Sequence, residues 1–384
     1  MTYDNLDLAA MRTRRNVKWS NVEPDQIPLW IAEMDFPVAN VITDGLTEFL
    51  LHGGAGYPAG AVIESQREAL VNWYRDSTGS AVDRSRLIEV PSVLTGLEIL
   101  VRQRVPEDSA VIVPVPAYMP FLQILGWLGR RIIPVPMLAP TAPGESYRYD
   151  LDGIDRAFGD GGKLLIICNP HNPTGALLSE AEAAALGEIV DRHCGIVFSD
   201  EIHVPLRYAD SPAFVGYGSV SETHASHTYT ALSASKGWNI PGLKCASVIA
   251  PSPEAVAQMA TAKPEPSSPG LLATDLAFRH GGPWLTETTA YLRGNIDVFS
   301  EFMERVFPEA SYAPPQATYL GWANLSALRP ESPETVAAYL ADEARVVVSN
   351  GADCGAPGFV RVNLATSRPV LEEALQRVER IVTR

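Results

Sequence analysis

The stretch Leu232-Ser-Ala-Ser-Lys-Gly-Trp-Asn-Ile-Pro-Gly242 is the one around which the chain is organised, and its centre is Lys236. The lysine follows a run of β-forming residues, and the small residues on both sides leave room for a bulky group against the backbone. Lys244 follows eight residues later, across a Pro-Gly turn. A lysine at a strand end is usually a solvated surface residue. Two amines around a small-residue loop instead suit a Schiff-base lysine beside an anion-binding one, because an amine is nucleophilic only when its pKa falls.

The composition is that of an ordinary globular protein, with 384 residues, 46% of them hydrophobic and 20% charged. This length allows one large domain and one smaller domain, each with its own core. The net charge of −15 argues against a nucleic-acid or anionic-membrane partner. No apolar stretch approaches the roughly 20 residues that span a bilayer, and the N-terminus does not resemble a signal peptide. The four cysteines are scattered, so we expect no metal site, no disulfide and a cytoplasmic location.

Polar residues follow two apolar strands in the middle of the chain. The run Lys163-Leu-Leu-Ile-Ile-Cys168 leads into Asn-Pro-His, and then Asn172-Pro-Thr-Gly175. Turn-forming residues alone would explain this pattern as a loop. The strand that starts near Gly195 ends in Asp200, where a doubly wound sheet places its site.

Three further positions have two interpretations each. A helix that opens at Thr95 offers free N–H groups to a phosphate, although threonine is also a common helix cap. Tyr118 follows a buried strand, where an aromatic residue fills a core or stacks on a ring. In the alternating stretch Phe359–Leu364, Arg361 and Asn363 share one face of the predicted strand. An arginine there is either a surface residue or a planar fork for a carboxylate.

In their order along the chain, these motifs resemble the fold-type I pyridoxal-phosphate enzymes of the class I/II aminotransferase superfamily, from about residue 26 to residue 365. Two segments, Pro28-Leu-Trp-Ile-Ala-Glu-Met-Asp-Phe36 and Ala317-Thr-Tyr-Leu-Gly-Trp322, resemble the cystathionine β-lyase-like branch of C–S lyases. Glu33 and Asn324 stand where that branch usually has aspartate.

The resemblance implies a large domain with a mostly parallel seven-stranded sheet flanked by helices, and a smaller α+β C-terminal domain. We therefore expect an N-terminal arm over residues 1–45 that joins the small domain, a large cofactor-binding domain over 46–280 and the small domain over 281–384. The resemblance also implies a homodimer, in which Tyr57 reaches the cofactor phosphate of the partner subunit.

The same resemblance implies that the cofactor is pyridoxal 5′-phosphate and that Lys236 is the catalytic residue that binds it. Further cofactor contacts are implied for Leu94, Thr95, Tyr118, Asn172, Asp200, His203, Ser233, Lys244 and Tyr57. Among these, Tyr118 stacks on the ring, Asn172 donates to the ring oxygen and Asp200 holds the ring nitrogen. His203 bonds either the ring oxygen or Asp200. The substrate contacts implied are Arg361, which grips the α-carboxylate, together with Trp30 and Tyr319.

The implied activity is β-elimination from an L-cysteine S-conjugate such as L-cystathionine, which gives a thiol, pyruvate and ammonia. Lys236 takes the α-proton as the general base. The same residues would serve an aminotransferase of an L-amino acid, which is the alternative. A non-catalytic regulator that kept the fold is a third hypothesis, and it predicts that Lys236 carries no cofactor.

Overall fold

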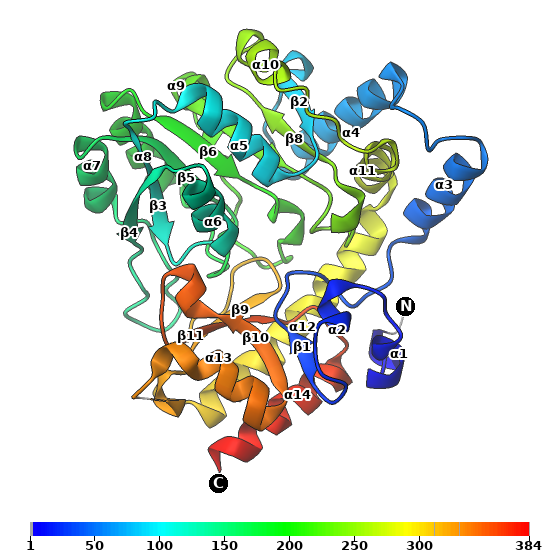
Figure 1. The fold of residues 1–384 in the computed structure, drawn as a ribbon, viewed down its shortest axis with the longest axis vertical. Coiled ribbons are helices and arrows are strands. Elements are labelled where there is room, and N and C mark those ends of the chain that lie inside the picture. Colours follow the sequence, from blue (N-terminus) through cyan, green and yellow to red (C-terminus); the bar gives the residue numbers. More distant parts are fainter. Residues whose placement is uncertain (1–2, 311, 330, 384) are drawn as a thin grey trace.

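The computed structural model describes residues 3–310, 312–329 and 331–383, and it contains two sheets, each with its own helices (Figure 1). The larger sheet has seven strands in the order β2-β8-β7-β6-β5-β3-β4. Its strands are β2 (Leu87–Val90), β3 (Ala110–Val115), β4 (Arg131–Pro136), β5 (Gly162–Cys168), β6 (Ile196–Asp200), β7 (Thr228–Leu232) and β8 (Ala246–Ile249). Within the described residues β8 alone runs antiparallel to its neighbours, so the predicted mostly parallel sheet is confirmed.

Helices cover both faces of this sheet, and alternate strand residues contact the two helical layers. One layer consists of α5 (Val93–Arg104), α6 (Met119–Trp127) and α10 (Pro253–Ala260). The other consists of α3 (Asn40–Leu51), α4 (Gly60–Thr78), α7 (Leu151–Gly159), α8 (Glu180–Arg192), α9 (Glu222–His227) and α11 (Ser268–His280). Burial on both faces explains why the central strands are nearly continuous runs of aliphatic residues.

The smaller sheet has the order β1-β10-β11-β9 and combines both ends of the chain. Its strands are β1 (Ile27–Leu29), β9 (Leu320–Asn324), β10 (Val346–Asn350) and β11 (Phe359–Asn363). The helices around it are α1 (Leu8–Arg12), α2 (Val17–Ser20), α12 (Gly282–Val306), α13 (Val336–Tyr339) and α14 (Arg368–Val382).

The N-terminal arm shares the core of the smaller sheet as far as Phe36, whereas α3 packs on α11. These contacts agree with an arm that joins the C-terminal half. The exact domain boundaries stay a prediction. No helix in the described part of the chain combines the length and the apolarity that crossing a membrane requires.

One local expectation was wrong. Helix α5 begins at Val93 rather than Thr95, because the Ser92 hydroxyl accepts the Thr95 N–H and so caps the helix. Two segments beside the smaller sheet are irregular. Strand β9 begins only at Leu320, after Thr318, whose φ of 71° does not fit a strand. Residues 333–344 form a 3₁₀ turn, α13 and a π-helical turn in succession, and Arg345 follows in the left-handed region.

Candidate active site

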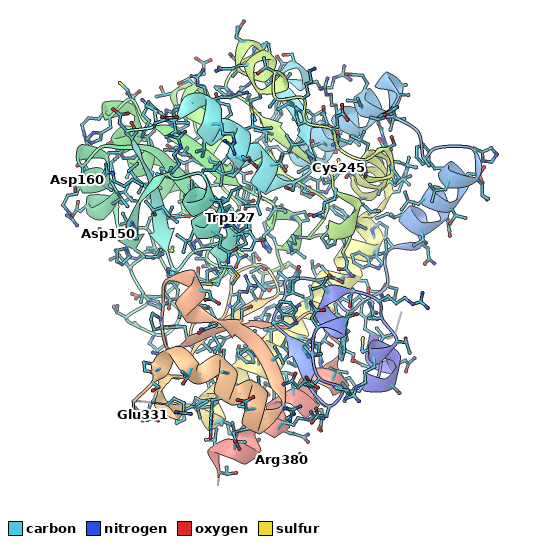
Figure 2. All side chains as sticks on the ribbon, viewed as in Figure 1. Trp127, Asp150, Asp160, Cys245, Glu331 and Arg380 are labelled. Carbon is cyan, nitrogen blue, oxygen red and sulfur yellow. The ribbon has the colours of Figure 1, made fainter. Side chains whose placement is uncertain are left out.

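Residues that follow the carboxyl ends of β3, β5, β6 and β7 line one cavity of about 170 Å³. This is where an open α/β sheet places its ligand. Eight of the predicted residues line the cavity: Leu94, Tyr118, Asn172, Asp200, His203, Ser233, Lys236 and Lys244. The cavity is also lined by Ser92, Val93, Ser235 and Cys245. Figure 2 labels Cys245, which lies in the half of the molecule that contains the larger sheet.

Lys236 lies in the turn after β7, and its amine donates to the backbone carbonyl of Ala32 at 2.5 Å. Burial lowers the pKa of this amine from 10.5 to about 8, and the charge of Arg361 acts in the same direction. Asp200 and Glu33 oppose the shift through their negative charges. A substantial neutral fraction at slightly alkaline pH makes the amine competent as a nucleophile and as a base.

Asp200 ends β6 and is 3% exposed. One of its carboxylate oxygens, Oδ1, accepts the Ile202 N–H at 3.0 Å. Burial raises the pKa of this carboxyl from 3.8 to about 7, while the Ile202 bond and the Lys236 charge lower it. The carboxyl therefore titrates near neutral pH in the cofactor-free chain, and a cationic ring nitrogen beside it would favour the ionised form.

Arg361 is 3% exposed, so its interpretation as a surface residue was wrong. Its Nη1 donates to Oδ1 of Asn172 at 3.0 Å, and its Nη2 donates to the Trp30 carbonyl and the Ser349 hydroxyl, both at 3.1 Å. Its Nε is buried and has no hydrogen-bond partner among the residues that the structure describes. Because buried donors are normally paired, this Nε suits a ligand acceptor. Because the Asn172 Oδ1 accepts the bond from Arg361, the N–H groups of the same amide remain available to a different acceptor.

His203 is buried, and its Nδ1 lies 3.1 Å from the Thr318 hydroxyl. Burial holds the pKa of the imidazole well below its usual value, so the ring is neutral. The ring of Tyr319 lies 6.2 Å away, edge to face. The Tyr118 ring meets Phe121 in the same manner at 5.3 Å. The neighbours of His203 and Tyr118 therefore fix their rings at the cavity wall.

Five predicted residues do not line the cavity: Trp30, Tyr57, Thr95, Tyr319 and Arg361, of which Arg361 contacts the lining residue Asn172. The Thr95 hydroxyl pairs with the Ser92 hydroxyl at 2.9 Å, and the first turn of α5 reaches the cavity through Ser92, Val93 and Leu94 instead. Tyr57 is 96% exposed, in the loop between α3 and α4. The backbone carbonyl of Trp30 accepts a hydrogen bond from Arg361 Nη2.

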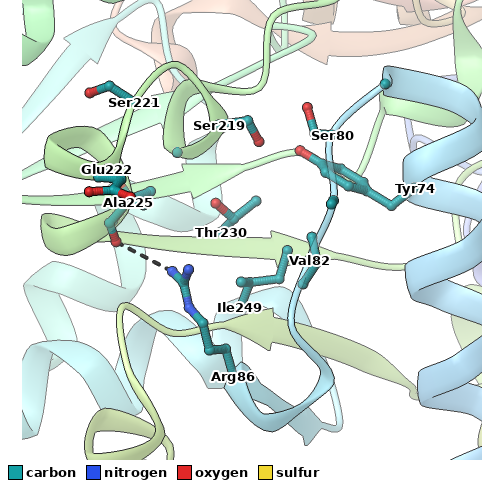
Figure 3. Close-up of a pocket in the computed structure, with 14 residues that line it drawn as sticks. Tyr74, Ser80, Val82, Arg86, Ser219, Ser221, Glu222, Ala225, Thr230 and Ile249 are labelled. Carbon is teal, nitrogen blue, oxygen red and sulfur yellow. Dashed lines mark hydrogen bonds between the residues drawn. The ribbon is translucent and has the colours of Figure 1, made fainter.

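A second cavity of about 410 Å³ lies elsewhere, lined by residues that include Tyr74, Arg86, Ser219 and Thr230 (Figure 3). None of the predicted site residues lines it. The Tyr74 hydroxyl donates at 2.8 Å to Glu201, the residue after Asp200. Size alone would favour this cavity. Because the smaller one gathers the lysine, the aspartate and the neutral histidine, we take the smaller one as the active site.

The chain is similar to known proteins over nearly its whole length. The Aminotransferase class I and II family matches residues 24–378. The chain is 31% identical over 383 residues to cystathionine beta-lyase of Corynebacterium glutamicum, covering 98% of this chain and 99% of that protein. A crystal structure of a putative PLP-dependent beta-cystathionase from Corynebacterium diphtheriae is similar with a TM-score of 0.91, at 30% identity over 98% of both chains. A PLP-bound putative aminotransferase from Clostridium difficile 630 gives a TM-score of 0.90, at 28% identity over 96% of both chains.

The cavity fits pyridoxal 5′-phosphate group by group. A phosphate would find the N-terminus of α5 with its free N–H groups and the Ser92 and Ser235 hydroxyls, whereas the Ser233 hydroxyl donates to the Cys245 carbonyl. A pyridine nitrogen would find the buried Asp200, and an aldehyde would find the Lys236 amine. The donor set of this structure therefore matches the cofactor.

Proposed function

The chain belongs to the aminotransferase class I and II family, and we propose that within this family it is a C–S β-lyase. Its cofactor is pyridoxal 5′-phosphate. The substrate that we propose is L-cystathionine or a related L-cysteine S-conjugate. The products are then a thiol, pyruvate and ammonia.

The proposal rests chiefly on the full-length similarity to a cystathionine beta-lyase, and one structural observation supports it. The segment Trp30–Phe36, which resembles the lyase branch in sequence, contacts both Lys236 and Arg361 through the carbonyls of Ala32 and Trp30. The segment that resembles the lyase branch therefore accepts hydrogen bonds from both the proposed base and the proposed carboxylate-binding group. Such contacts can distinguish a lyase from its relatives without any change in the shared residues.

When bound, pyridoxal 5′-phosphate supplies an electron-poor ring that stabilises negative charge at the substrate α-carbon. Arg361 would bind the substrate α-carboxylate, using the buried Nε for which the described part of the chain offers no partner. The Lys236 amine would remove the α-proton, for which a pKa of about 8 is well matched to neutral or slightly alkaline conditions. Asp200 would keep a proton on the ring nitrogen, and Tyr118 would pack against the ring.

A product assay tests the proposal. The purified, cofactor-loaded protein is incubated with L-cystathionine or an S-alkyl cysteine, and thiol, pyruvate and ammonia are quantified without any keto acid. We expect all three to form in equal amounts. A requirement for 2-oxoglutarate, with no free thiol released, would contradict the lyase assignment.

An aminotransferase of an L-amino acid is the second candidate, favoured by the similarity to the putative aminotransferase from Clostridium difficile 630. The same residues would bind the amino acid and move its α-proton. The product assay separates the two, because a transaminase consumes a keto acid and leaves the C–S bond intact.

We further propose a homodimer that completes each active site. Tyr57 is nearly fully exposed, Leu51 at the end of α3 is 76% exposed, and neither lies at the cavity of its own chain. Large exposed side chains of this kind suit a subunit interface. Tyr57 would there reach the phosphate group in the partner's site. The cytoplasmic location also stays a prediction.

A further inference from the structure

Residues 30–36, which we call the strap, connect β1 of the smaller sheet to α3 on the larger one (Figure 1). The strap belongs to neither sheet. Ala32, Met34 and Phe36 are nonetheless buried, so the backbone polar groups around them need partners from elsewhere. Side chains from both halves of the molecule supply those partners.

Asn363 on β11 holds the strap from the side of the smaller sheet. Its Nδ2 donates to the carbonyls of Ile31 and Glu33, at 2.6 and 2.7 Å. These two carbonyls flank Ala32. Asn363 is fully buried, and its Oδ1 accepts the N–H of Ala365 at 2.8 Å, so its amide orientation is fixed.

Asn239 holds the strap from the side of the larger sheet. It lies three residues after Lys236, and its Nδ2 donates to the carbonyls of Met34 and Phe36, both at 3.0 Å. Its Oδ1 accepts the Met34 N–H at 2.9 Å. Its φ is 58°, a left-handed conformation that asparagine tolerates better than most residues. The turn that carries the lysine is thus bonded directly to the strap.

A buried ion pair adds a third attachment. The Asp35 carboxylate accepts from the Lys18 amine and from the Trp19 indole N–H, both at 2.7 Å. Both charged side chains are completely inaccessible to solvent. Displacing the strap would separate this pair inside the protein, which is strongly unfavourable.

We propose that Asn239 and Asn363 clamp the strap from two sides so that the Ala32 carbonyl is a fixed resting acceptor for the Lys236 amine. Both asparagines are then positioning residues for Lys236, an inference that rests on the role proposed for that lysine. The fixed carbonyl orients the amine and the strap keeps water away from it. A loosened strap would admit water, and the pKa of the amine would return towards 10.5.

The test uses cofactor-free protein, so its outcome does not depend on which products the enzyme forms. Asn239→Gly removes the side chain while the left-handed backbone stays unstrained. The Lys236 amine is labelled with an amine-specific reagent from pH 6 to 11, and the Lys236 peptide is quantified by mass spectrometry. The exposed Lys263 is the internal reference.

In the wild type we expect half-maximal labelling of Lys236 near pH 8. In Asn239→Gly the midpoint should rise by about one pH unit or more. The matched control is Thr228→Val, which loses a buried bond to the His224 carbonyl at the far end of β7 and bonds no strap residue. Its Lys236 midpoint should equal that of the wild type. An unchanged midpoint in folded Asn239→Gly protein would overturn the proposal.

A measurement on the unmodified protein keeps the proposal testable if Asn239→Gly does not fold. The Met34 amide donates to Asn239, so hydrogen exchange of the strap peptide should be slow at this position. Exchange of the Met34 amide at the rate of an unstructured peptide would show that the strap is not clamped.

Discussion

Replacing Lys236 with methionine should stabilise the cofactor-free protein at neutral pH while it removes the group that binds the cofactor. The amine is enclosed between the strap and the cavity wall, and burial lowers its pKa from 10.5 to about 8. Because the lysine pKa is lower in the folded protein than in the unfolded chain, protonation of this amine destabilises the folded state. Methionine has a similar length and carries no charge.

The magnitude follows from the pKa. A shift of two to three pH units corresponds to about 3 kcal/mol of destabilisation when the lysine is protonated in both the folded and the unfolded chain. The variant also loses the hydrogen bond to Ala32, which costs about 1 kcal/mol. The net gain at pH 7 is therefore about 2 kcal/mol in the free energy of unfolding.

The pH dependence gives the sharper test. Below pH 8 the cost is fully present, because folded and unfolded lysine are both charged. Between pH 8 and 10.5 the folded amine is neutral while the unfolded one still binds its proton, so wild-type stability rises. The advantage of Lys236→Met should therefore shrink across this window.

Urea unfolding of the cofactor-free proteins at pH 7 and pH 10, followed by far-UV circular dichroism, measures the difference. Lys263→Met is the control, since an exposed lysine should change stability by less than about 0.5 kcal/mol. If Lys236→Met were no more stable at pH 7, or if its advantage were the same at both pH values, the assigned burial of the amine would be wrong.

Three further predictions follow from the site and its surroundings. Arg361→Lys should lower kcat/KM about 10- to 100-fold through lost carboxylate binding, while the visible spectrum of the bound cofactor stays the same; steady-state kinetics and a spectrum of the same sample check this. Burial raises the pKa of Glu201 from 4.5 to about 8, so the folded chain keeps a proton that the unfolded chain loses, and stability should fall as pH rises through this window. Glu201→Gln should flatten that slope in urea unfolding, and an unchanged slope would mean that another group causes it. Mixing inactive Lys236→Ala and Tyr57→Ala subunits should restore about a quarter of wild-type activity, because a mixed dimer has one complete site; no recovery after verified subunit exchange would exclude Tyr57 from the partner's site.

Much of the fold was predictable because its signals are local. The apolar strand that leads to Cys168 and the strand-end Asp200 lie where the sequence indicated. The start of α5 was misplaced because Ser92 and Thr95 are both good caps, and only the backbone direction after β2 decides between them.

The contacts that organise the site were not predictable, because they join residues far apart in the chain. Asn239 and Asn363 each bond the strap across more than 200 residues, and neither belongs to a motif that indicates such a partner. The Ala32 acceptor is a backbone carbonyl, which no side-chain pattern reveals. The burial of Arg361 stayed open at the sequence level, because strand alternation identifies two faces but does not show that both are covered.

Covalent attachment of the cofactor tests the central claim most directly. The loaded protein is reduced with borohydride, digested and searched by mass spectrometry for a phosphopyridoxyl group on each of its five lysines. We predict the modification on Lys236 alone, at close to one group per chain. An unmodified Lys236, or the group on Lys18, Lys163, Lys244 or Lys263 instead, would contradict the account.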